Sequence, residues 1–174
     1  PFAYPINLVY ALRNGVSPGR YDLLAGRNFL GDPLQPFGRV DVGNGDEWVL
    51  DEGWHQPERE GAITFRWATT SAGVIIPLHH AAPLRVQVRL HAFAFPGSPE
   101  QSMRFVVNGH EHGPAPVSPG WHIVDLDVPE DEWRRGVNRV VLRFAWEDQP
   151  AKVGLGGDTR ALAAAVDYIR VTIR

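Results

Sequence analysis

Apolar side chains recur at every second position over most of this chain, from about Arg39 to Arg174. The alternation is clearest in 63–68, 85–90, 139–146 and 169–174. A period of two is typical of β-strands, because successive side chains point to opposite faces of a sheet. By this alternation Trp67 and Trp146 are predicted to face inward. Phe93 and Phe95 stand on the face that is polar in 85–90, which indicates either a bulge or cover on both faces.

Turn signals divide the rest of this region into further short strands. We expect strands at 47–50, 73–78, 103–107 and 122–128, and a tight hairpin at Asn108-Gly109, a dipeptide favoured where both central residues need positive φ. The return strand should run through His110 to His112. No intervening helix is long enough for a parallel crossover. The pattern therefore predicts an all-β fold, an antiparallel jelly-roll sandwich with eight or so strands.

The first residues have a different pattern. Helical spacing and the positions of Pro and Gly predict two short helices, over 5–14 and 17–26. We therefore divide the chain into a helical N-terminal extension, 1–38, and a β-sandwich domain, 39–174. The chain starts at Pro1 without an initiator Met or signal-peptide layout, so we expect a processed product or a piece of a longer protein.

Composition excludes several classes of function. A formal net charge of −3, without a long run of either sign, disfavours nucleic acid and anionic membranes as partners. Cysteine is absent, which excludes disulfides, thiolate zinc sites and a cysteine nucleophile. No apolar stretch is long enough for a transmembrane helix. All basic residues except Lys152 are arginines, a bias that indicates a bacterial source of high GC content.

Short motifs follow one another in a particular order along residues 39–174. They are Asp46-Glu47, Gly53-Trp54, Glu58, Phe65-Arg66-Trp67, Val107-Asn108-Gly109, Gly120-Trp121, Val128-Pro129, Gly136-Val137-Asn138, Asp158-Thr159-Arg160 and a final Val-Asp-Tyr-Ile strand. This order resembles that of galactose-binding-like sandwiches, and more narrowly the carbohydrate-binding-module-like domains appended to bacterial membrane glycosyltransferases and sulfatase-like enzymes. The resemblance implies a non-catalytic module, often glycan-binding and often carrying a structural calcium ion.

Tryptophans are the first candidates for a ligand site. An indole face can stack on a pyranose while nearby polar groups bond its hydroxyls. Trp54, Trp121 and Trp133 lie next to turn signals and are candidates for display on loops. The alternative is that each is a core residue, which is common for Trp in a sandwich.

Charged side chains supply a second group of candidates. Arg66 with Glu58, and Arg160 with Asp158, could clamp a carboxylate or sugar hydroxyls, since a guanidinium donates in a planar fork. Ion pairs that fix loops are the alternative. Oxygen ligands for calcium are offered by a short acidic segment, although its spacing does not match an EF-hand: Asp41, Asn44, Asp46 and Glu47.

Catalytic signals are weak. His110 and His112 could share a strand face but have no evident third metal ligand. Glu58 lacks a recognisable acid/base partner, the acidic segment 130–132 is typical of a solvated turn, and no nucleophile elbow, phosphate loop or zinc-protease motif occurs. We therefore expect a protein that is not an enzyme.

Two functions are consistent with these sequence features. The first is a glycan-binding module, with Trp54, Glu58, Arg66, Trp121, Asp158 and Arg160 as ligand-binding residues. It would serve a parent or partner enzyme that is secreted or in the bacterial cell envelope, extracellular or periplasmic. The second is a structural or protein-interaction sandwich without a sugar ligand, able to form a homo-oligomer. A small hydrolase is a distant third.

Overall fold

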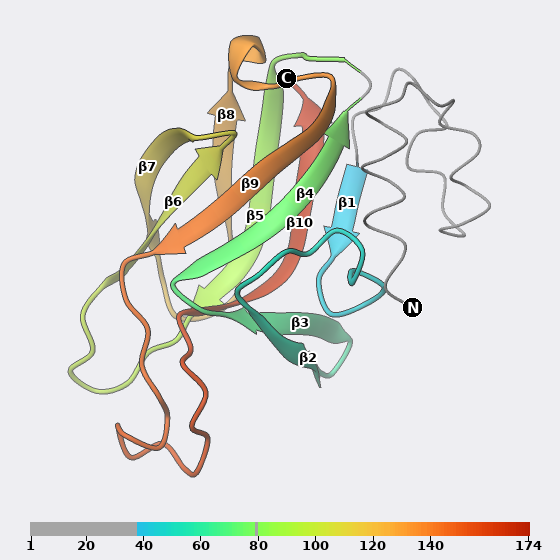
Figure 1. The fold of residues 1–174 in the computed structure, drawn as a ribbon. Helices are drawn as coiled ribbons and strands as arrows, with labels where there is room; N and C mark the ends of the chain where they lie inside the picture. The colour runs from blue at the N-terminus through green and yellow to red at the C-terminus, as the bar shows by residue number, and fades with distance from the viewer. Residues whose placement is uncertain (1–37, 79) are drawn as a thin grey trace.

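The computed structural model describes residues 38–78 and 80–174. Within these ranges the chain forms a sandwich of two antiparallel sheets (Figure 1). The larger sheet has the strand order β2-β3-β10-β5-β8, and β1 also pairs with β10; its strands are β1 (Gly38–Asp41), β2 (Trp54–Glu60), β3 (Ile63–Ala68), β5 (Leu84–Ala92), β8 (His122–Val128) and β10 (Ala164–Ile173). The smaller sheet has the order β4-β9-β6-β7; its strands are β4 (Ser71–Leu78), β6 (Gln101–Val107), β7 (His110–Val117) and β9 (Gly136–Phe144).

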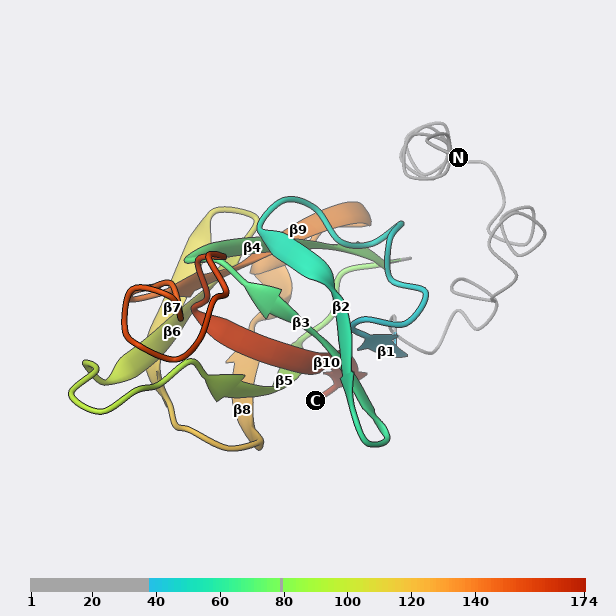
Figure 2. The same cartoon turned by 90° about the horizontal axis from the view of Figure 1, so that it is seen from below.

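The two sheets lie face to face as separate layers. Seen from below, β4 and β9 lie in one layer and β3, β10 and β5 in the other (Figure 2). Short connections join most strands, and a 3-10 turn, η2 (Glu130–Glu132), precedes β9. In the described part of the chain no helix is long and apolar enough to cross a membrane. The predicted all-β sandwich is confirmed. Both predicted helices, 5–14 and 17–26, and His79 lie outside the described residues.

Apolar side chains from both sheets fill the space between the layers. In the larger sheet, Val86, Val88 and Leu90 of β5 are fully buried. In the smaller sheet, Val74 and Ile76 of β4 are equally buried. These positions belong to one continuous core, so the two-residue alternation arises because each strand buries one face and exposes the other.

Strand β10 lies in the middle of the larger sheet and changes its inward face along its length. Val166 points into the core next to Leu90, whereas farther along Ile169 does so next to Val88. The pairing register shifts between Val166 and Tyr168, because Asp167 is an extra residue in β10. Before this bulge the even-numbered side chains face the core, and after it the odd-numbered side chains do. Strand β3 pairs with β10 before this bulge and β1 pairs with it after the bulge.

Several strands lie where the alternation and turn signals predict them. The predicted strand 122–128 is β8, and Asn108 and Gly109 connect β6 to β7 with φ values of 50° and 99°. Both residues have the positive φ that a type I′ turn requires, which confirms the predicted hairpin. Of the two explanations for Phe93, a bulge or cover on both faces, the second holds. Strand β5 ends at Ala92 without a bulge of its own, and the neighbouring Ala92 and Phe93 are both buried.

The predicted strand at 47–50 is wrong. This segment is a turn, in which the N–H groups of Val49 and Leu50 both donate to the Asp46 carbonyl at 3.0 Å. Only Leu50 forms a bridge, to Val74 on β4. The turn packs against β4, so that Val49 is buried and Trp48 and Leu50 are partly buried against the core.

The inward orientation predicted for Trp67 and Trp146 is also wrong. In β3 it is Ala68 that joins the core, next to Ala164 of β10. Trp67 pairs with Ala165 and therefore points to the opposite side, the outer face of the larger sheet. Trp146 lies beyond the end of β9, and its indole N–H donates to the Glu100 carbonyl.

Candidate functional site

Seven aromatic rings form a connected row on the outer side of the larger sheet and at the adjoining end of the sandwich. We call this row the aromatic face, and its members are Phe65, Trp67, His91, Phe93, Phe95, Trp121 and Trp146. Neighbouring ring centroids are 4.5 to 6.3 Å apart, mostly edge to face. This spacing is typical of favourable aromatic pairs. The rings therefore form a second apolar cluster outside the main core.

Trp121 lies at one end of the aromatic face, against Phe65 and His91. It immediately precedes β8, at one edge of the larger sheet, yet its indole N–H donates to Glu60 at the end of β2, at the opposite edge, over 3.3 Å. Its ring centroid lies 4.5 Å from that of His91 and 5.4 Å from the Arg89 guanidinium carbon. The segment leading to β8 must therefore fold over the outer face of the sheet, where Trp121 is only half-buried.

A small side chain makes room for this arrangement. Ala165 of β10 lies between Trp67 of β3 and His91 of β5 in the strand register. It is fully buried although it points away from the core. The outer face is therefore hollow at Ala165, and the surrounding rings cover the hollow.

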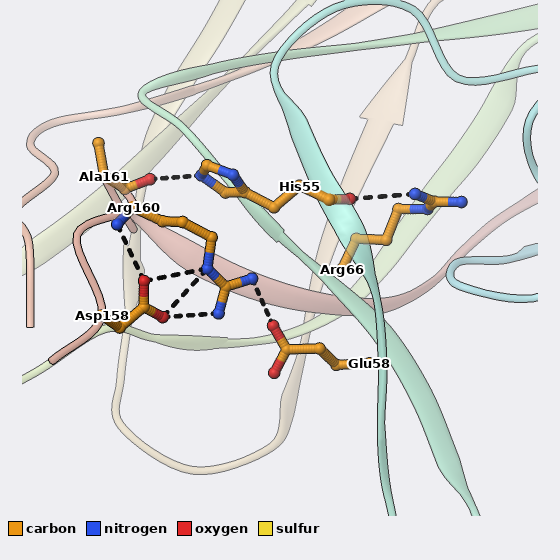
Figure 3. Close-up of polar contacts among 6 residues, drawn as sticks. All are labelled: His55, Glu58, Arg66, Asp158, Arg160 and Ala161. Atoms are coloured by element: carbon orange, nitrogen blue, oxygen red, sulfur yellow. Dashed lines mark hydrogen bonds and ion pairs between the residues drawn. The ribbon is translucent and has the colours of Figure 1, made fainter. Parts of the chain in front are cut away.

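The side chains of Glu58, Asp158 and Arg160 meet in one cluster (Figure 3). The Arg160 guanidinium donates to both oxygens of Asp158, at 3.1 Å to Oδ1 and 2.6 Å to Oδ2, and to Glu58 at 2.6 Å. Glu58 is paired in register with Phe65, so it points to the same side as the aromatic face. Arg160 and Asp158 thus form an ion pair that fixes a loop, which was the alternative to a ligand clamp, and the Arg160–Glu58 pair links the β9–β10 connection to β2.

Charge pairing shifts the pKa values of this cluster. The side-chain hydrogen bonds from Arg160 are the main reason that the pKa of Asp158 falls to about 2. Hydrogen bonds to Asp158 raise the pKa of Arg160 further above its ordinary value. Asp158 is therefore ionised at any physiological pH and forms a fixed ion pair with Arg160.

The predicted pairing of Arg66 with Glu58 is wrong. Arg66 is paired in register with Pro57, one residue from Glu58, and therefore points to the other side of the β2–β3 hairpin. There it is buried and donates to both carboxylate oxygens of Asp46, each at 2.8 Å. It also donates to the His55 carbonyl (Figure 3).

Two tryptophans predicted on loops have structural positions instead. The indole N–H of Trp54 donates to the Gly73 carbonyl at 2.7 Å while its ring packs on the core. Trp133 is 4% exposed, and its indole nitrogen is buried without a hydrogen-bond partner among the described residues. Of the six predicted ligand-binding residues, the structure thus brings four to one side of the larger sheet: Glu58, Trp121, Asp158 and Arg160.

The predicted calcium ligands do not form a ligand set. Both oxygens of Asp46 are taken by Arg66, and one also accepts the Gly43 N–H at 2.6 Å. Asp41 binds Arg39 instead, and Glu47 lies 3.8 Å from Arg66. Among residues 38–78 and 80–174 no three His, Asp or Glu side chains come together as metal ligands. His112, considered for a metal pair with His110, binds Glu132 at 2.5 Å.

Three further residues of the site were not predicted from the sequence: Glu60, Arg89 and His91. Arg89 is held by an ion pair with Asp167, the buried residue at the β10 bulge. Burial lowers the pKa of His91, because the charged imidazolium would lose hydration under the neighbouring rings. The only sequence signal for them is Asp167, an acidic residue within an otherwise apolar stretch.

No protein-family model and no curated protein sequence matches this chain. Similar solved structures include a family 35 carbohydrate-binding module from an environmental isolate (18% identity, TM-score 0.47, 72% of this chain and 92% of the module). Another is the family 35 carbohydrate-binding module from Clostridium thermocellum (13% identity, TM-score 0.48, 77% of this chain and 97% of the module). A third is a ruminal GH26 endo-β-1,4-mannanase (13%, 0.49), which matches 80% of this chain but only 26% of the enzyme.

Two of these three structures are carbohydrate-binding modules by name. The similarity concerns the fold. The function is therefore inferred below from the residues of this chain alone.

Proposed function

We propose that this chain contains a non-catalytic glycan-binding domain, and that the outer side of its larger sheet holds the ligand. The observation that carries the proposal is the position of Trp121, a half-buried indole fixed across the sheet, with Glu60 at its N–H and Arg89 over its ring. Sugar sites in proteins combine an aromatic surface for the apolar side of a pyranose with polar groups for its hydroxyls. Both elements lie within contact distance of one another here.

The polar groups around Trp121 are held in place before any ligand arrives. Arg160 is fixed by two carboxylates, and Arg89 is fixed by the buried Asp167. Side chains that are already ordered lose little conformational entropy when they bind a ligand. The exposed carboxylate of Glu60 adds an acceptor for sugar hydroxyls.

The charge states in this cluster support a role in binding rather than in catalysis. Glycoside hydrolysis generally requires one carboxylic acid that carries a proton near neutral pH, opposite a second carboxylate. Arg160 stabilises the ionised form of Asp158 and also pairs with Glu58, so Asp158 is a poor proton donor. We extend the proposal to the setting that the resemblance implies, a module of a larger secreted or cell-envelope enzyme of a bacterium.

A glycan array followed by calorimetry tests the proposal. Wild type should bind at least one glycan class, and Trp121→Ala should abolish that binding. Trp48→Ala is the matched control, because Trp48 is also half-buried but lies in the segment before β2 and is not a member of the aromatic face. Failure of the wild type to bind any glycan, together with a defined oligomer in solution scattering, would favour the alternative of an assembly domain.

A further inference from the structure

A cavity of about 350 Å³ opens at the end of the sandwich beside the aromatic face. One wall comes from the β5–β6 connection, with Ala94, Ser98 and Glu100, and the other from the β7–β8 connection, with Ser118 and Pro119. Its volume falls within the range of small-molecule sites, roughly 300–1,000 Å³. Phe93 is the one member of the aromatic face among its lining residues.

The cavity adjoins the aromatic face at Phe93, and its opposite wall is close to Trp121 in the sequence. Phe93 lines it, and the centroid of the Phe93 ring lies 6.0 Å from that of Trp67 on the aromatic face. On the opposite wall, Pro119 is two residues before Trp121. A chain of sugar units that stacks on Trp121 can therefore continue into the cavity.

The lining of the cavity indicates which sugar it accepts. Eleven described residues line it, and none is Arg, Lys or His. Its polar side chains include Glu100, which is exposed, and the hydroxyl groups of Ser98 and Ser118. Glu100 would repel a second carboxylate, since no cation in the lining offsets the two negative charges.

Gln101, the buried polar residue of the lining, already has hydrogen-bond partners within the protein. The amide of Gln101 donates to the carbonyls of Trp146 and Ala163, at 2.8 and 3.3 Å. Its oxygen accepts the N–H groups of Ser102 and Ala145, both at 3.0 Å. Gln101 therefore holds the end of the sandwich together, and recognition is left to Glu100, the two hydroxyls and the apolar surface.

We propose that this cavity is a second subsite, which binds a pyranose unit without an anionic group while the neighbouring unit of the same chain lies on Trp121. The inference depends on the proposed glycan-binding function. It adds that the ligand is an oligosaccharide of neutral or amino sugars and that uronic acids are rejected.

Calorimetry with oligosaccharides of one to five units tests both parts. The probes are neutral hexose oligomers, amino-sugar oligomers and oligouronates of matched length. Affinity for a neutral or amino series should rise at least about tenfold between one and three units, and the oligouronates should not bind. Ala94→Trp, which fills the cavity, should remove this gain while the affinity for the single unit stays as in wild type.

Ser118→Trp fills the cavity from the opposite wall, so the test does not depend on the folding of one variant. Near-ultraviolet circular dichroism identifies the variants that are folded. Equal affinity for neutral oligomers and oligouronates, or an unchanged gain with length in a folded filled variant, would overturn the subsite. Absence of binding for every probe, or wild-type binding by Trp121→Ala, would instead overturn the proposed function.

Discussion

Trp121 and Glu60 are joined by a hydrogen bond of 3.3 Å across the outer face of the larger sheet, although 61 residues separate them in the chain. They come from opposite edges of this sheet, because Trp121 precedes β8 and Glu60 ends β2. The bond therefore fixes the position of the indole relative to the strands beneath it. The proposed ligand surface depends on this connection between two sheet edges.

Removing the acceptor should loosen Trp121 without unfolding the domain. Because the bond is exposed, Glu60→Ala should cost less than about 1 kcal/mol of stability but weaken glycan binding, since the indole loses its fixed orientation. Calorimetry and urea unfolding measure the two effects. Glu60→Gln is the control, because its amide oxygen can still accept the bond. Equal binding by Glu60→Ala and wild type would show that Trp121 needs no support from β2.

The hollow at Ala165 should be sensitive to size. Ala165→Leu adds a branched side chain at a fully buried position between Trp67 and His91, so we expect a loss of about 1–3 kcal/mol from overpacking. It should also displace Trp121 and reduce glycan binding. Urea unfolding and tryptophan fluorescence report these changes. Ala151→Leu, at an exposed position of the β9–β10 connection, should leave both unchanged.

Periodicity in the sequence predicts where strands lie, but not which face of a strand meets the core. In β3 the large apolar residues Phe65 and Trp67 alternate with Thr64, Arg66 and Ala68, and the aromatic set was the natural choice for the interior. The structure reverses this choice. The outer face has its own cover, supplied by Trp121, while Ala68 fits the core and Arg66 is buried by pairing with Asp46.

The candidate site was predictable only where its residues are neighbours in the sequence. Asp158 and Arg160 are two residues apart, and their ion pair is confirmed. The partner of Glu58, by contrast, lies 102 residues away, and it reaches β2 only because the β9–β10 connection folds back to that edge. Contacts of this kind depend on strand order, which alternation does not contain.

The buried ion pair between Arg66 and Asp46 should be important for stability. Arg66→Met leaves the fully buried Asp46 carboxylate without its cation, and we expect a loss of about 3–5 kcal/mol. The exposed pair between Arg104 and Glu111 is the matched control, and Arg104→Met should cost less than about 1 kcal/mol. Chemical denaturation of both variants measures the difference. Similar losses for the two would mean that water reaches Asp46.

The pKa of Asp158 predicts a contribution to stability in acid. Its folded-state pKa is lowered from an ordinary value of 3.8 to about 2, so the folded state binds this proton less readily than the unfolded state. The contribution is therefore present above pH 3.8 and is lost as the pH falls toward 2. In Asp158→Asn the decline of stability over this interval should be shallower than in wild type. Nuclear magnetic resonance titration of the carboxyl carbon measures the pKa directly, and a value near 3.8 would contradict the Arg160 contact.

His91 should add a second pH dependence, nearer to neutrality. Burial lowers its pKa below the ordinary value of 6.5, so the imidazole stays neutral in the folded protein while it takes up a proton more readily when unfolded. Stability linked to His91 is therefore present above pH 6.5 and declines as the pH falls through the lowered folded-state pKa. Protonation should also repel Arg89, the neighbouring cation beneath Trp121, and so weaken glycan binding.

Replacement of His91 by Phe separates this effect from the other histidines. His91→Phe keeps an aromatic ring against Trp121 but cannot take up a proton, so its stability and glycan affinity should fall less between pH 7.5 and about 5.5 than those of wild type. His110→Gln is the control, since His110 is exposed and distant in the strand order from the aromatic face. Urea unfolding and calorimetry at the two pH values provide the comparison. If His91→Phe and wild type decline in parallel, the imidazole is already hydrated in the folded state and the rings above it do not exclude water.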